Sequence, residues 1–79
     1  MKARVTVTLK SGVLDPQGKA IEGALQSLKV DGILEVRQGK VFEIELAEMD
    51  AGRAKAVLGE ACEKLLANTV IESYRFELV

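Results

Sequence analysis

The ten residues from Leu9 to Gly18 carry three structural signals in a row and constrain the fold more than any other stretch. The hydrophobic alternation that precedes them ends at Leu9, as at the end of a strand with one buried face. Gly12 offers the backbone freedom for a reversal. Asp15-Pro16 then predicts an N-cap followed by proline at the first helical position. A strand must therefore be followed, within a short loop, by a helix.

The remaining sequence repeats this plan of strand, aspartate-capped helix and strand. A helical stripe of Ile21, Ala24, Leu25 and Leu28 follows the loop, and Asp31-Gly32 marks its end. Asp50 is a second N-cap candidate. We predict strands over residues 2–10, 33–37, 40–46 and 70–78, helices from Pro16 and over 51–67, and a hairpin turn at Gln38-Gly39.

These elements predict an α+β fold: a two-layer sandwich of βαββαβ, ferredoxin-like topology with an antiparallel sheet and both helices on one face. The whole chain, residues 1–79, forms one domain with two similar halves, about 1–38 and 39–79. The expected strand order is 4-1-3-2, which places the basic outward row of Arg4 and Lys10 beside the acidic row of Glu43 and Glu45. Strands two and four would be open edges, where another subunit can add.

Composition limits how such a chain can be stabilised. Its 79 residues are 48% hydrophobic but only 4% aromatic, so the core must be built from small aliphatic side chains. One cysteine excludes an internal disulfide, and the lack of histidine argues against a zinc site. We therefore expect a homodimer or higher oligomer. The net charge of −1, the alternating N-terminus and the lack of a long apolar run predict a cytoplasmic protein that binds neither nucleic acid nor membrane.

Three strings of the sequence resemble one family in the same order. They are Lys10-Ser11-Gly12-Val13-Leu14-Asp15-Pro16-Gln17-Gly18, Val36-Arg37-Gln38-Gly39-Lys40, and Cys62-Glu63-Lys64-Leu65-Leu66-Ala67-Asn68 followed by Val70-Ile71-Glu72. Together they resemble PurS, the small subunit of phosphoribosylformylglycinamidine synthase, over essentially the whole chain. Thr69 departs from the proline usual in that family, which bears on how stiffly the chain enters the last strand.

The resemblance implies a non-catalytic assembly subunit in purine biosynthesis. It would act as a dimer that bridges a glutaminase subunit, which releases ammonia, and a large synthetase subunit, which binds ATP and magnesium. No catalytic, cofactor or metal residue is expected on this chain itself. The family motifs imply a partner-contact surface at Lys10, Gly12, Val13, Asp15 and Pro16, with Arg37 and Lys40 behind them.

Two single motifs could also be interpreted as a catalytic or a phosphate-binding site, but the surrounding residues argue against both. Cys62 could be a nucleophile, but it lies on the apolar stripe of a helix and no histidine is present to activate it, so we expect a core residue. The Ser11–Gly18 loop could cradle a phosphate, but Asp15 puts a negative charge at the cap and the glycine spacing matches no phosphate motif.

Three other functions occur on the same topology. An acylphosphatase would need an arginine in the loop after the first strand, and this loop has none. An RNA-binding module would need aromatic side chains on the exposed faces of the central strands, where Arg4, Thr6, Thr8, Glu43 and Glu45 are expected. A regulatory sensor domain that binds an amino-acid-type ligand stays open as the alternative, because fold alone does not decide function.

Overall fold

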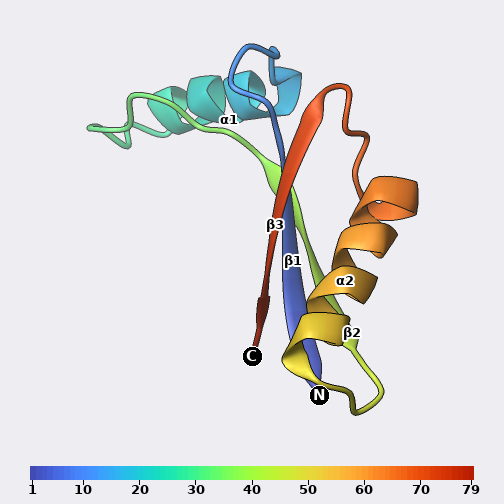
Figure 1. Ribbon diagram of the computed structural model, residues 1–79. Coiled ribbons are helices and arrows are strands. Elements are labelled where there is room, and N and C mark those ends of the chain that lie inside the picture. Colours follow the sequence, from blue (N-terminus) through green and yellow to red (C-terminus); the bar gives the residue numbers. More distant parts are fainter.

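The computed structural model describes residues 1–79 as a three-stranded antiparallel sheet with two helices (Figure 1). Strand β1 (Lys2–Leu9) lies between β2 (Gly39–Glu45) and β3 (Glu72–Leu78). The register places Val5 opposite Phe42 on one side and opposite Phe76 on the other. The predicted α+β class is confirmed, and so are the antiparallel sheet and the neighbours of its central strand.

The core lies between the sheet and helix α2 (Ala51–Ala61), which is capped at Asp50 as predicted. The inward side chains of β1 meet one face of α2 and of η1 (Cys62–Leu66), the π-helical turn that continues it. Phe42, Tyr74 and Phe76 pack around this cluster from the two outer strands. The buried hydrophobic residues are Ala3, Val5, Val7, Ala54, Leu58, Cys62 and Ala67.

The π-turn changes which residues at the end of the second helix face the core. With 3.6 residues per turn, Leu65 would follow Leu58 and Cys62 into the core. The wider turn, closed by the bond from the Ala67 N–H to the Cys62 carbonyl, rotates the last residues by about one position. Leu66 therefore packs against the core, whereas Leu65 is 83% exposed.

The sheet lacks one of the four expected strands, the second, which is predicted to lie at its edge. Residues 33–37 are not a strand, no hairpin forms at Gln38-Gly39, and β2 is an open edge in place of the expected second strand. The reason lies in the backbone amides, because the Val36 N–H donates to Glu22 and the Gln38 N–H donates to Asp15. Alternate N–H groups of an extended chain face one side, and here two carboxylates on or beside the first helix take the place of a neighbouring strand.

Helix α1 (Pro16–Ser27) also differs from the expectation, since it does not cover the sheet. It lies beyond the end of β1, and the chain returns along it to β2 (Figure 1). Its apolar stripe is correspondingly open, with Ile21 38% and Leu28 73% exposed. We call residues 10–38, which contain α1 and the segments on either side of it, the arm. No helix of the structure is long and apolar enough to cross a bilayer.

The arm gives the molecule an extended shape. The radius of gyration is 15.9 Å, compared with about 11.6 Å for a compact domain of this length. The solvent-accessible surface is 5772 Å², about 1,100 Å² more than a compact protein of this mass exposes. The expected pairing of charges across strands is present at Arg4, which lies 4.0 Å from Glu43 and 3.7 Å from Glu77.

Candidate functional site

The predicted contact residues gather where the arm meets the sheet. Lys10 follows β1 directly, and its N–H donates to the Ile71 carbonyl just before β3. The loop then turns on itself through a bond of 2.9 Å from the Val13 N–H to the Lys10 carbonyl. The glycine in this turn is not in the left-handed region, and a Cβ at Gly12 would meet no atom within 4 Å. The reversal therefore does not depend on glycine, contrary to the expectation from sequence.

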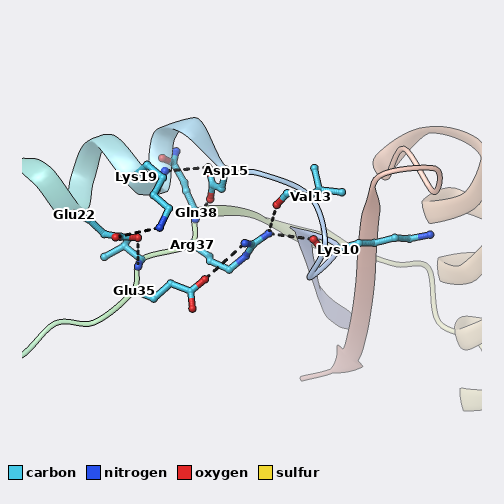
Figure 2. Close-up of polar contacts among 10 residues, drawn as sticks. Lys10, Val13, Asp15, Lys19, Glu22, Glu35, Arg37 and Gln38 are labelled. Carbon is cyan, nitrogen blue, oxygen red and sulfur yellow. Dashed lines mark hydrogen bonds and ion pairs between the residues drawn. The ribbon is translucent and has the colours of Figure 1, made fainter.

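Asp15 joins the start of α1 to the segment that returns to β2. Its side chain accepts from the Gly18 N–H at 2.9 Å, which is the predicted N-cap, and from the Gln38 N–H at 2.6 Å (Figure 2). The residue is 6% exposed. These two hydrogen bonds lower the pKa of the Asp15 carboxyl from its ordinary 3.8; burial opposes them and the nearby Arg37 guanidinium adds to them. The carboxylate is thus held ionised between two segments far apart in sequence.

Arg37 makes a second contact between the same two segments, in the opposite direction. Its Nη2 donates to the Lys10 carbonyl at 3.1 Å and to the Val13 carbonyl at 2.9 Å, closing the turn from outside (Figure 2). Its Nη1 lies 3.8 Å from the exposed Glu35 carboxylate. The side chain of residue 37 therefore binds the loop, while the backbone N–H of residue 38 donates to Asp15. We call these contacts of Asp15 and Arg37 with Lys10, Val13 and Gln38 the clasp.

Residues in the first turns of α1 also contact the returning segment, next to the clasp. Glu22 accepts from the Val36 N–H at 3.0 Å and lies 3.5 Å from Lys19. Gly18 is buried, and a Cβ there would collide with the Val36 carbonyl oxygen and the Asp15 carboxylate. The sequence alone does not reveal these roles of Glu22 and Gly18. The Val36-Arg37-Gln38 string is the one sequence signal near this contact. Nothing local marks a carboxylate that binds an amide 14 residues away.

Lys40 lies apart from the clasp. Its Nζ is 3.6 Å from the Glu72 carboxylate, so this pair spans from β2 to β3 across β1. Glu72 also accepts from the Asn68 N–H at 2.6 Å and so fastens the turn before β3. The structure thus brings together Lys10, Val13, Asp15 and Arg37, leaves Gly12 and Pro16 on the surface beside them, and places Lys40 in a separate contact.

Two further features bear on chemistry. Cys62 is fully buried in the core, as predicted, and burial raises the pKa of its thiol, with nearby Glu63 raising it further. An open hollow of about 410 Å³ lies at the end of the sheet, between Arg4, Glu43, Glu45 and Val79. The charges along it are of both signs and Arg4 is paired, so the hollow has no unpaired cluster suited to one kind of charged ligand.

Comparisons with known proteins agree on one family. A family model described as "PurS: Phosphoribosylformylglycinamidine (FGAM) synthase" matches residues 2–79. A phosphoribosylformylglycinamidine synthase subunit PurS from Bacillus subtilis is 47% identical over 77 residues, which cover 98% of this chain and 90% of the relative. The corresponding subunit from Synechocystis is 48% identical over 95% of this chain and 75% of the relative.

Solved structures give the same result. A Thermotoga maritima structure described as PurLQS contains a chain that is 32% identical, with a TM-score of 0.91 over 99% of this chain and 95% of that one. The PurS structure of Methanocaldococcus jannaschii is 39% identical, with a TM-score of 0.87 over 96% and 92% of the two chains. These findings do not favour the alternative of a sensor domain.

The clasp predicts a pH-dependent stability. Because folding lowers the pKa of Asp15, its contribution is complete above the unfolded value of 3.8 and is lost as the pH falls through the folded value. Asp15→Asn should destabilise the protein at pH 7, since an amide NH2 then faces a backbone N–H. The difference from the wild type should shrink below pH 3.8. Urea unfolding across this range measures it.

Asp31→Asn is the control, because it removes the same charge from an exposed turn. We expect little change from this variant at either pH. A deficit of Asp15→Asn that stays constant down to the lowest pH would contradict a stabilising role for the ionised carboxylate.

Proposed function

Because the chain belongs to the PurS family of phosphoribosylformylglycinamidine (FGAM) synthase, we propose that it is a non-catalytic subunit that bridges the other two. One partner is a glutaminase subunit that releases ammonia from glutamine. The other is a large synthetase subunit that binds ATP and magnesium and uses the ammonia. The enzyme serves purine biosynthesis, converting formylglycinamide ribonucleotide to formylglycinamidine ribonucleotide. The Thermotoga maritima PurLQS structure, which contains a chain of the same fold, supports this assignment.

One observation carries the bridging role: the chain places a large part of its length outside its own core. No residue of the arm belongs to the apolar cluster between the sheet and α2. The arm nevertheless holds six of the twelve large hydrophobic side chains that are exposed, namely Leu14, Ile21, Leu28, Val30, Ile33 and Leu34. Apolar surface of this extent on an ordered element is typical of a surface that other subunits cover.

The geometric role follows from the chemistry of ammonia. Protonation in bulk water converts ammonia to ammonium, which has no free electron pair and cannot attack the activated substrate. The site that releases ammonia must therefore stay in register with the site that consumes it. The small subunit would hold that register and would take no part in bond making.

A second copy of the chain is the occupant we propose for the apolar side of the arm. The surface excess of about 1,100 Å² matches the roughly 800 Å² that each partner buries in a standard interface. The equally open sheet edges offer less apolar surface, since Val41 is the one exposed large hydrophobic residue of β2 and β3. The homodimer would thus be held by its arms.

Sedimentation velocity tests the dimer. We expect a species of about twice the 8.5 kDa chain mass at micromolar concentration. Leu28→Asp should shift it toward monomer, because Leu28 lies on the stripe of α1. Leu65→Asp is the matched control, with an exposed leucine on η1 outside the arm. A wild type that is monomeric at these concentrations would exclude the dimer, and equal effects of both variants would exclude the arm as its interface.

We propose that the outward side of the clasped loop contacts one of the larger subunits. Lys10, Gly12, Val13 and Pro16 would form this surface, Asp15 and Arg37 would support it, and Lys40 would extend it along β2. Gly12 gives the sharpest probe, because its φ and surroundings would accept alanine in the free chain. If a partner packs against this glycine, the added methyl group must collide with it.

Gly12→Ala should therefore leave the unfolding midpoint unchanged and weaken binding to the partner subunits by at least about fivefold, the cost of one poorly accommodated methyl group. Gly59→Ala, on α2 with equally open space, should change neither quantity beyond a small helix-propensity gain. Titration calorimetry against each larger subunit measures the affinity. Equal affinities for both variants would remove Gly12 from the contact surface.

Reconstitution tests the bridging role directly. Product formation by the two larger subunits is measured with glutamine or with ammonium salt as the nitrogen source, with and without this chain. We expect the chain alone to hydrolyse neither glutamine nor ATP. Its addition should raise glutamine-dependent synthesis strongly and leave ammonia-dependent synthesis nearly unchanged. Full glutamine-dependent synthesis without the chain would contradict the proposal.

A further inference from the structure

The arm is joined to the sheet at a single place. It leaves at Lys10, after β1, and returns at Gln38, before β2, and these two strands are neighbours, with Thr8 opposite Gly39. The apolar cluster contains no arm residue that could hold the arm at a fixed angle. The polar clasp is what ties the leaving and returning segments together at this point (Figure 2).

We propose that Arg37 is a positioning residue for ammonia transfer in the assembled synthase. By holding the carbonyls of Lys10 and Val13, its guanidinium ties the returning segment to the residue that follows β1. The N–H of Lys10 is itself bonded to the Ile71 carbonyl just before β3, so this link restricts the angle between the arm and the sheet. That angle determines how the subunits seated on the arm and on the body of the chain face each other. This inference rests on the proposed bridging function and adds to it the residue that sets the geometry.

The contacts of Arg37 favour this role over direct recognition of an acidic partner surface. Nη2 already donates to two backbone carbonyls of the same chain. The side chain is 31% exposed, and Glu35, 3.8 Å away, supplies a negative charge on its remaining side. An arginine used for docking would present its donors outward. Here Nη2 faces the loop and Nη1 faces Glu35, and the loop presents its own outer surface, including the 70% exposed Leu14.

The clasp also needs both of its halves. Arg37 binds the leaving segment, and Asp15 on that segment binds the amide of the residue next to Arg37. Loss of Arg37 leaves only the bond from the Gln38 N–H to Asp15, and loss of Asp15 leaves only the two bonds from Arg37. A small change in angle at the base of the arm becomes a larger displacement at its end, because the molecule is 48 Å long in its greatest dimension.

The experiment uses the reconstituted three-subunit synthase. Arg37→Ala should lower glutamine-dependent synthesis by about tenfold and ammonia-dependent synthesis by less than about twofold, because displacement of two sites by about an ångström has effects of this order or larger. Glutamate released per product formed should rise above that of the wild type. Arg37→Lys should restore part of the coupling, since an ammonium group keeps the charge but lacks the fork.

Glu35→Ala is the matched control on the same segment. It removes the exposed ion pair of Arg37 but leaves both bonds to the carbonyls, so coupling should stay as in the wild type. Asp15→Asn breaks the other half of the clasp and should give the same split between nitrogen sources as Arg37→Ala. It keeps the proposal testable if Arg37→Ala fails to fold, as judged by circular dichroism.

The possible results distinguish a failure of the positioning role of Arg37 from a failure of the proposed function. Wild-type coupling in a folded, assembled Arg37→Ala complex would overturn the positioning role. A parallel fall of both activities, or a loss of assembly, would also overturn it and make Arg37 a contact or folding residue. If omission of the whole chain leaves glutamine-dependent synthesis unchanged, the proposed function itself fails, and that result is obtained without any Arg37 variant.

Discussion

The structure depends on a few side chains that act as hydrogen-bond partners for backbone groups elsewhere in the chain. Asp15 is the central one: a single carboxylate caps α1 and also accepts from the amide that precedes β2. Glu22 does the same for Val36. These two bonds hold the returning segment beside α1, where the sequence predicts a strand of the sheet.

This division leaves a small body and an exposed arm. The body has an ordinary core, in which the inward face of β1 meets α2 and the π-turn. The arm has local order, with a capped helix and a clasped loop, but almost no apolar burial of its own. A free chain of this kind holds surface that other chains must cover. The same property that makes it a poor independent domain suits it to an assembly.

The bridging role proposed for this chain depends on position more than on reactivity. The buried Cys62 and the paired charges on the sheet agree with the non-catalytic role that we propose. The polar contacts at the base of the arm are directional, and they specify an angle more sharply than apolar contacts do. In the proposed role the fold itself is the functional device, and the clasp is where its geometry would be set.

The sequence alone determined the elements that obey local rules. The alternation of β1, the aspartate caps of both helices and the buried cysteine appeared as predicted, because each depends on residues close together in the chain. The first two motif strings also contain the residues that form the clasp. Only the tertiary structure decided the rest: that residues 33–37 stay out of the sheet, that α1 does not cover it, and that Arg37 faces the loop. Each of these depends on side chains pairing with backbone amides or carbonyls far along the chain, and no periodicity records such pairs.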